Sequence, residues 1–308
     1  MSPAFPHDLL RAAFGERLQI AVPLARLTSA RIGGTADYYV EARSSTELAG
    51  IVSQLWELDL PYIILGGGSN ILVSDAGVRE VVVHNRARGV RFEEHNKSAL
   101  VHAESGTNFG VLARQTALQS LSGLEWAAGI PGTVGGAVFG NAGAHGGDMA
   151  GNLHVADILH PQEGRRSWAG GELAFAYRSS ILKRKYPDAV VLAADLKLDP
   201  GDPESIERTM NDNLEHRRRT QPPGASMGSM FKNPSGDFAG RMIEAVGLKG
   251  LRVGDAQISQ LHGNFFLNQG AATAADVFVL LSKSREAVQR HFGVELELEV
   301  ELVGEWSE

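Results

Sequence analysis

Hydrophobic residues recur with two different periods along the chain, and these periods predict helices and strands in mixed order. Apolar residues form one helical stripe between residues 45 and 60, for which Ser45 is a suitable N-cap. A short apolar run at 62–65 predicts a buried strand, and residues 71–84 predict further short strands. The pattern therefore indicates a small α/β unit over residues 1–85.

The chain beyond this unit continues to alternate between strands and helices. Residues 204–220 predict a helix that ends before Gln221-Pro222-Pro223, because proline cannot continue a helix. We therefore expect three domains, over residues 1–85, 86–213 and 214–303, followed by a short tail at 304–308. The other expected elements are strands at 90–94, 99–106, 189–198 and 264–268 and helices at 109–120 and 273–292.

The strictest alternation lies at the end of the chain, from Gly293 to Gly304. Successive side chains of a strand point to opposite faces, so the pattern predicts one strand with its glutamates on a single face. A row of glutamates normally faces water, since this residue is rarely buried without a partner. Periodicity alone cannot select one member for chemistry among Glu295, Glu297, Glu299 and Glu301.

The composition is that of an ordinary soluble globular protein and removes several classes of function. The 308 residues are 43% hydrophobic and 21% charged, and the net charge of -7 gives no general attraction to nucleic acid or anionic membranes. The absence of cysteine excludes disulfides, thiolate catalysis and metal–thiolate sites. The sequence shows neither a signal peptide nor an apolar stretch long enough to span a bilayer, so we expect a cytoplasmic protein.

Glycine is unusually frequent, with 36 residues, and it is concentrated in a few loops. The sequence LGGGSN ends a predicted strand, where backbone N–H groups can hold a phosphate; a tight turn is the alternative. The glycine-dense stretch Ala127–Asp148 favours a backbone-lined groove for an elongated ligand over regular structure. Its apolar residues, among them Ile130 and Phe139, argue against the alternative of a flexible linker.

Two further stretches carry candidate polar groups. Arg178 lies in FAYRSS, where its guanidinium could clamp a carboxylate or a phosphate, although an ordinary surface arginine is the more common case. Ser229 lies in GSMFKNP without a neighbouring histidine or a nucleophile elbow, so a hydrolase nucleophile is disfavoured relative to a turn serine.

These stretches together resemble one family, the UDP-N-acetylenolpyruvoylglucosamine reductases. The motifs occur in family order: ARIGGTADYYV, LPYIILGGGSNILVSD, GLEWAAGIPGTVGGAVFGNAGAHG, YRSS, GSMFKNP, GLKGLRVGDAQISQLHGNFFLN and GVELELEV. The chain differs from the family in having Thr28-Ser29 where Asn-Thr is usual and His145 where tyrosine is usual. It is similar to the shorter form of the family, which lacks a tyrosine-bearing insertion over the substrate.

The resemblance implies an α+β fold and a bound flavin. The fold would be a two-part FAD-binding unit of the vanillyl-alcohol-oxidase type, followed by a C-terminal α/β substrate-binding domain. No metal site is implied, and a monomer is expected. The residues implied to hold FAD, largely through backbone groups, are Gly66, Gly67, Gly68, Ser69, Asn70, Gly129, Ile130, Pro131, Gly132, Gly135, Gly136, Asn141, Ala142 and Gly143.

The resemblance also implies a reaction, the NADPH-dependent reduction of UDP-N-acetylglucosamine enolpyruvate to UDP-N-acetylmuramate for peptidoglycan. Arg178 and Glu299 would polarise the substrate carboxylate, and Ser229 would deliver a proton to the alkene carbon. A glutamate in this role must be protonated, which requires a raised pKa. His262 is expected to be structural, and the candidates for the UDP diphosphate are Lys232, Asn233 and Arg219.

Two other functions remain as alternatives at this stage. One is a different FAD oxidoreductase on the same scaffold, which would not be reoxidised by the enolpyruvyl substrate after reduction by NADPH. The other is a non-catalytic module that senses nucleotide sugars, which would show no flavin absorption even after FAD is added.

Overall fold

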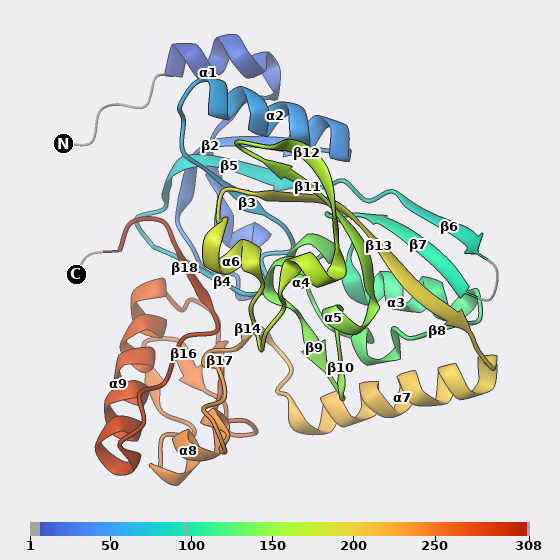
Figure 1. Ribbon diagram of the computed structural model, residues 1–308. Helices are drawn as coiled ribbons and strands as arrows, with labels where there is room; N and C mark the ends of the chain where they lie inside the picture. The colour runs from blue at the N-terminus through green and yellow to red at the C-terminus, as the bar shows by residue number, and fades with distance from the viewer. Residues whose placement is uncertain (1–6, 96–97, 307–308) are drawn as a thin grey trace. The chain divides into compact units, whose positions relative to one another are not determined.

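The computed structural model describes residues 7–95 and 98–306 and shows two compact units (Figure 1). We call them unit 1, formed by the described residues within 1–39, 68–82 and 218–308, and unit 2, formed by those within 40–67 and 83–217. Each unit therefore contains segments that are far apart in the sequence. The division into three domains at 85/86 and 213/214 stays a prediction.

Unit 2 contains a six-stranded antiparallel sheet with the order β12-β11-β13-β7-β6, to which β8 adds beside β13. The alternation in β7 buries every second residue, as the sequence pattern predicts. Helix α4 packs on the face of this sheet that carries the buried residues (Figure 1). The bounds are β6 Val90–His95, β7 Ser98–Glu104, β8 Leu121–Ser122, β11 Leu153–His160, β12 Gly164–Ala169, β13 Val190–Pro200 and α4 Val134–Gly140.

The first predicted helix is confirmed, but its cap is shifted by one residue. Helix α2 spans Ser45–Glu57 and buries Leu48, Ile51, Val52 and Leu55 on one stripe. Its N-cap is Ser44, whose side chain accepts a hydrogen bond from the N–H of Glu47 at 3.1 Å. The sequence pattern had indicated Ser45 as the N-cap, and this was wrong by one residue. Ser45 is the first residue of the helix.

Helix α4 contradicts the expectation that the glycine-dense stretch lacks regular structure. Thr133 caps this helix by accepting a weak hydrogen bond from the N–H of Gly136 at 3.4 Å. A Cβ on Gly135 would lie 2.9 Å from the Cβ of Ser105, so glycine allows the helix to approach the neighbouring loop closely. Tertiary packing here outweighs the low helix propensity of glycine.

A second sheet has the strand order β1-β2-β5-β3, with β1 antiparallel to β2. The strand expected at 62–65 is present as β3, but only Leu65 is fully buried and the other three residues are half-buried. The bounds are β1 Gln19–Pro23, β2 Thr35–Ala42, β3 Tyr62–Leu65 and β5 Val78–Asn85.

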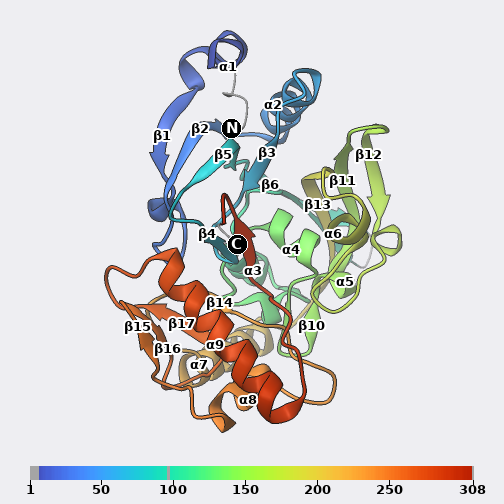
Figure 2. The same ribbon diagram turned by 90° about the vertical axis from the view of Figure 1, so that its left-hand side faces the viewer.

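Unit 1 contains a four-stranded antiparallel sheet, β14-β17-β16-β15, with helix α9 packed against it and α8 beside α9 (Figure 2). Its core includes Phe231 and Phe266, whose rings meet edge to face. The bounds are β14 Ala225–Ser229, β15 Arg252–Val253, β16 Ala256–Ile258, β17 Phe265–Asn268, α8 Ala239–Ala245 and α9 Ala274–Phe292.

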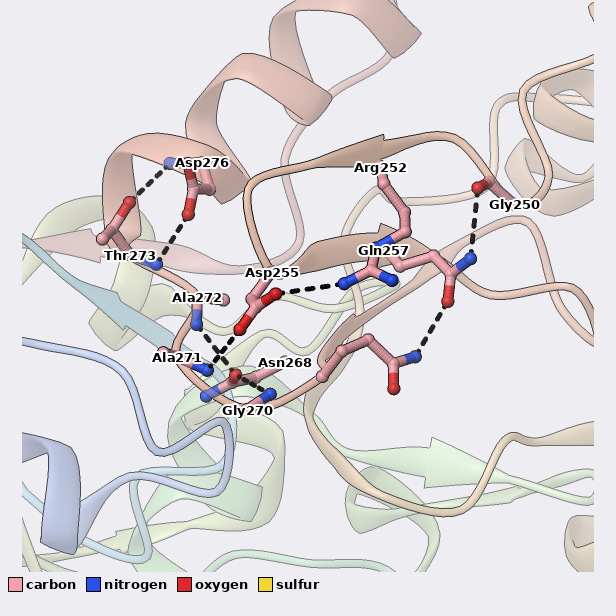
Figure 3. A network of polar contacts seen from close by, with 11 residues as sticks. Gly250, Arg252, Asp255, Gln257, Asn268, Gly270, Ala271, Ala272, Thr273 and Asp276 are labelled. Atoms are coloured by element: carbon pink, nitrogen blue, oxygen red, sulfur yellow. Dashed lines mark hydrogen bonds and ion pairs between the residues drawn. The ribbon is translucent and has the colours of Figure 1, made fainter.

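A polar network fixes the turn that leads into α9 (Figure 3). Asn268 accepts hydrogen bonds from the N–H groups of Gly270 and Ala272, and Thr273 and Asp276 form a reciprocal capping box. Asp75, from the turn after strand β4 (Ile71–Val73), accepts from the first two N–H groups of α9 at 2.8 and 2.9 Å. A carboxylate at this position also suits the helix dipole.

The strand expected over Gly293–Gly304 is much shorter than its pattern indicated. Only Glu301–Val303 form strand β18, which pairs in parallel with β4. The preceding residues meet Met230–Lys232 through one antiparallel bridge between Phe231 and Leu298. The segment thus changes partner along its length, which a continuous alternation cannot reveal.

The remaining elements agree with the sequence pattern where it made a prediction. Helix α7 spans Pro203–Thr220 and α3 spans Phe109–Leu118. No helix in the described ranges has both the length and the apolarity needed to cross a membrane. The other elements are α1 His7–Phe14, α5 Met149–Asn152, α6 Ile181–Lys185, β9 Gly143–Ala144 and β10 Gly147–Asp148, with short 3-10 turns at Gly15–Arg17, Leu24–Leu27, Glu125–Ala127 and Gly170–Leu173.

His262 occupies a packed position in unit 1, and we expect it to make stability depend on pH. Its Nδ1 accepts the N–H of Asn264 at 3.2 Å, and burial, followed by the charge of Lys249, lowers its pKa from 6.5. The unfolded chain therefore takes up a proton near pH 6.5 while the folded chain resists it, so stability falls as the pH drops below that value. Thermal unfolding at pH 7.5 and 5.5 should show a smaller loss for His262→Gln than for the native protein. Equal losses in the two proteins would contradict this role.

Candidate active site

Two glycine turns of unit 2 lie directly against each other. A Cβ on Gly66 would lie 2.7 Å from Thr133 Oγ1, and a Cβ on Gly67 would lie 3.0 Å from the Cα of Gly132. Side chains at these two glycines would push the turns apart. Gly66–Gly67 and the glycine-dense stretch Ala127–Asp148, which the sequence indicated separately, therefore form one surface of backbone groups within unit 2, which we call the glycine surface.

Gly68, which the sequence also marked, lies in unit 1 against the loop that begins at Thr28. Its φ is +58°, and its carbonyl accepts the N–H of Ser29 at 2.9 Å. The side chain of Thr28 closes the same loop by bonding to the backbone of Ile32. Thr28 and Ser29, where the chain differs from the family, thus form part of an ordered turn that contacts Gly68 through Ser29.

Arg178 lies in a tight turn of unit 2 that is tied to the glycine surface. Ala176 and Ser179 pair across this turn, and the φ of Arg178 is +52°, which is unusual for a residue other than glycine. The Arg178 guanidinium donates to the carbonyl of Gly143 at 2.9 Å. The buried Asn141 donates to the carbonyl of Ala176 at 3.1 Å. The arginine therefore has a constrained backbone, as is common at functional sites.

Ser229 and Glu299 are linked through the backbone of unit 1. Ser229 ends β14, after a register shift that follows Ser226. The next residue, Met230, accepts the N–H of Glu299 at 2.8 Å through its carbonyl. The side chain of Asn264 in turn bonds to both the N–H and the carbonyl of Phe231. The serine and the glutamate are thus held in adjacent backbone segments.

The four terminal glutamates differ in exposure, although their spacing is identical. Glu295 and Glu297 have side chains that are 76% and 74% exposed, and they pair with Arg285 and Lys232 respectively. Glu301 is also exposed, whereas Glu299 is half-buried. Burial therefore distinguishes Glu299 from the other three, which periodicity could not do.

The residues expected to hold the UDP diphosphate also lie in unit 1. The ammonium group of Lys232 is 3.0 Å from Glu297, and Asn233 accepts the N–H of Ala239 at the start of α8. Arg219 lies in the last turn of α7 and is exposed. Lys232 and Asn233 are thus adjacent, while Arg219 belongs to another segment.

His145, the second departure from the family pattern, lies beside His216 and Arg217 of unit 2. Its ring faces His216 with centroids 5.4 Å apart. Burial, followed by the charges of His216 and Arg217, lowers the pKa of His145, and burial also lowers the pKa of Arg217. Arg217 is near the glycine surface, since a Cβ on Gly129 would lie 3.5 Å from its Nε. The guanidinium of Arg217 supplies a positive charge there, which suits an anionic ligand.

Several residues that organise the site carried no signal in the sequence analysis. Asn264 and Asp75 act through backbone groups that are distant in the sequence, which only the fold brings near. Thr107 is buried beside the glycine surface, and its hydroxyl has no hydrogen-bond partner among the described residues.

Of the three expected catalytic residues, the structure links Ser229 and Glu299 within unit 1, and Arg178 belongs to unit 2.

The glycine surface fits the chemistry of a flavin dinucleotide. The sequences of Gly66–Asn70 and Gly129–Gly143 contain no acidic residue that would repel a diphosphate. The buried Thr107 hydroxyl supplies a polar group without a partner in the described part of the chain, and Arg217 adds a positive charge nearby. No group of three or more potential metal ligands occurs within the described ranges.

Comparisons with known proteins agree with this fit. A model described as FAD binding domain matches residues 36–160, and one described as UDP-N-acetylenolpyruvoylglucosamine reductase, C-terminal domain, matches residues 220–303. The fold and the donor set define an FAD-dependent oxidoreductase with an α+β FAD-binding fold and a separate C-terminal domain.

Full-length relatives identify the family. The chain is 43% identical to UDP-N-acetylenolpyruvoylglucosamine reductase of Chloroflexus aurantiacus, covering 91% of this chain and 96% of the relative. It is 47% identical to the enzyme of that name from Rubrobacter xylanophilus, covering 92% and 94%. The crystal structure of the reductase from Thermus caldophilus matches with a TM-score of 0.77 and 37% identity, covering 93% and 98%. The chain belongs to the UDP-N-acetylenolpyruvoylglucosamine reductase family.

Proposed function

We propose that this chain reduces UDP-N-acetylglucosamine enolpyruvate to UDP-N-acetylmuramate, with Ser229, Glu299 and Arg178 as its catalytic residues. Membership of the reductase family supports the reaction. The observation that carries the residue assignment is the backbone link through Met230, which holds Glu299 beside the segment of Ser229. FAD, held by the glycine surface, would supply the hydride-transfer chemistry between NADPH and the enolpyruvyl group.

The contribution of the protein is to hold charge and to supply a proton. Reduction places negative charge on the carboxylate side of the substrate, and preorganised donors stabilise such charge best. The guanidinium of Arg178 and a protonated Glu299 would meet this carboxylate. The hydroxyl of Ser229 would donate its proton to the alkene carbon, which requires that it be held in contact with that atom.

The proposed binding residues follow from the same chemistry. The glycine surface and Gly68, Ser69 and Asn70 would hold FAD, with the hydroxyl of Thr107 as an additional donor. Lys232, Asn233 and Arg219 would hold the UDP diphosphate, with Lys232 exchanging its exposed partner Glu297 for phosphate.

The test of the function is to observe the two half-reactions separately by stopped flow. NADPH should bleach the flavin, and the enolpyruvyl sugar nucleotide should restore its absorption. Rapid reduction without reoxidation by this substrate would support a different flavoenzyme. The absence of flavin bands after FAD is added would support a non-catalytic sensor.

We also propose that the enzyme acts as a monomer in the cytoplasm, where it supplies peptidoglycan precursors. Its substrates, a nucleotide sugar and a dinucleotide, are water-soluble. Light scattering of the FAD-loaded protein at micromolar concentration checks the monomer, since a dimer would scatter as a particle of twice the mass of 33.0 kDa.

Gly68→Ala is expected to weaken FAD binding by tenfold or more and to lower stability by about 1–3 kcal/mol. The new Cβ would lie 2.2 Å from the carbonyl oxygen of Leu27, and the positive φ of Gly68 strains any other residue. Flavin fluorescence titration and thermal unfolding measure the two effects.

Gly50→Ala is the matched control for this prediction. Gly50 lies within α2, and a Cβ added there would meet no other atom within 4 Å. Alanine should therefore raise stability by about 0.5–1 kcal/mol and leave FAD affinity unchanged. Native FAD affinity in Gly68→Ala would contradict the proposed role of this turn.

A further inference from the structure

Asn70 contacts the backbone of Glu299 directly. Its side-chain Nδ2 donates to the carbonyl of Glu299 at 3.0 Å. The N–H of Glu301 donates to the backbone carbonyl of Asn70, also at 3.0 Å. Glu299 also donates its own N–H to Met230 at 2.8 Å. The peptide groups on both sides of the Glu299 Cα are therefore fixed, one by the residue after Ser229 and the other by Asn70.

The position of Asn70 in the fold explains this contact. Asn70 immediately precedes β4, whose first residue, Ile71, pairs in parallel with Glu301. The backbone bond from Glu301 to Asn70 continues this ladder by one residue, and the amide side chain extends it to Glu299. Asn70 therefore contacts the half-buried Glu299, which precedes the first residue of β18, Glu301.

The side-chain chemistry at position 70 matters for this contact. The carbonyl of Glu299 can only accept a hydrogen bond, so the residue at position 70 must supply a donor of suitable reach. Asparagine supplies one through its amide, whereas alanine supplies none and aspartate would place an acceptor against an acceptor. Glu299 keeps its bond to Met230 in either case.

We propose that Asn70 is a positioning residue for the reaction, which fixes the backbone of Glu299 and so the direction of its carboxyl group. This inference rests on the proposed catalytic role of Glu299. Small displacements of a catalytic group lower rates because the reacting geometry is narrow. Asn70 also belongs to the turn that is proposed to hold FAD, so one turn serves the cofactor and the acid together.

The test is a double-mutant cycle with Asn70→Ala and Glu299→Ala, measured in the FAD-loaded enzyme by stopped flow. Asn70→Ala alone should slow reoxidation by the enolpyruvyl substrate about fivefold to tenfold, as expected for the loss of one hydrogen bond. Because Asn70 is also proposed to contact FAD, reduction of the flavin by NADPH serves as the reference, and reoxidation should be slowed at least about threefold more than reduction. In the Glu299→Ala background the same change should slow reoxidation by less than about twofold, because the hydrogen-bonding side chain that Asn70 positions is absent.

Two further variants separate positioning from flavin binding and from folding. Asn70→Asp keeps the size of the side chain and should slow reoxidation at least as much as alanine does. Ser69→Ala alters the neighbouring residue of the same turn and should show no coupling to Glu299→Ala. FAD affinity is measured for each variant by flavin fluorescence.

The outcomes distinguish this inference from the proposed function. If Glu299→Ala slows reoxidation and its effect multiplies with that of Asn70→Ala, the positioning role of Asn70 is overturned and the role of Glu299 stands. Equal slowing of both half-reactions by Asn70→Ala would also overturn it, because a general structural defect or a lost flavin contact would then be the cause. If Glu299→Ala reacts at the native rate, the catalytic assignment fails, and the inference fails with it.

Discussion

Replacing Ser229 with alanine is expected to slow reoxidation of the reduced enzyme by the enolpyruvyl substrate about 10²- to 10⁴-fold, the range typical of a lost general acid. Reduction of the flavin by NADPH should remain close to the native rate, because no proton from Ser229 is needed in that step. The backbone around Ser229 should be unaffected, since Met230 and Phe231 are held by Asn264 through bonds that do not involve the hydroxyl. Separate stopped-flow measurements of the two half-reactions show the difference directly.

Ser226→Ala is a matched control for this experiment. Ser226 lies on the same strand, β14, and is half-buried like Ser229, but it precedes the register shift. Both half-reactions of this variant should stay within about twofold of native rates. If Ser229→Ala slowed the two half-reactions equally, the proton-donor assignment would be wrong, even if overall turnover were lost.

Local patterns predicted the regular elements well because they depend on residues that are close in sequence. Helix α2 follows from an apolar stripe and the end of α7 from the prolines at 222 and 223, and the structure places α2, α7 and α9 within a few residues of the expected bounds. The alternation of β7 likewise follows from a sheet with one buried face. These features reflect side-chain periodicity, which a sequence shows directly.

The failures occur where long-range packing decides the local structure. Helix α4 contains paired glycines at 135 and 136, which disfavour a helix by propensity alone. The helix is stabilised by its packing, and Gly135 allows it to approach Ser105 closely because glycine has no side chain. The terminal segment loses its continuous strand because it pairs first with Met230–Lys232 and then with β4. Neither partner can be deduced from the periodicity of the segment itself.

The candidate site shows the same division between local and distant information. Glycine density predicted a backbone-lined groove, which stays a prediction, and the structure places the turns at Gly66–Gly67 and Gly132–Thr133 against each other. Selection of Ser229 and Glu299, in contrast, came from resemblance to a family. The supporting contacts of Asn70 and Asn264 depend on segments more than thirty residues away in sequence, so no local pattern could have indicated them.

The second large effect is expected from Glu299→Gln, which should slow reoxidation by the enolpyruvyl substrate about tenfold to hundredfold. The exchange preserves size and leaves the backbone bonds to Met230 and Asn70 in place. An amide can still donate a hydrogen bond to the substrate carboxylate, but it is a weaker donor than a carboxylic acid. Glu299→Ala removes the donor altogether and should cost about 10²- to 10³-fold, as for one donor of an oxyanion site. Reduction by NADPH should again be nearly unchanged.

Two neighbouring glutamates provide the decisive comparison, because they share the spacing of Glu299 but not its burial. Glu295→Gln and Glu297→Gln alter side chains that are more than 70% exposed and paired only at the surface, so each should change either half-reaction by less than about threefold. Glu297→Gln also removes the ion-pair partner of Lys232, which is proposed to bind the diphosphate. Any effect of this loss should change the substrate concentration needed for the half-maximal rate of reoxidation, and not the limiting rate. If all three substitutions slowed reoxidation alike, the effect would come from the summed charge of the segment, and the assignment of one acid at position 299 would be wrong.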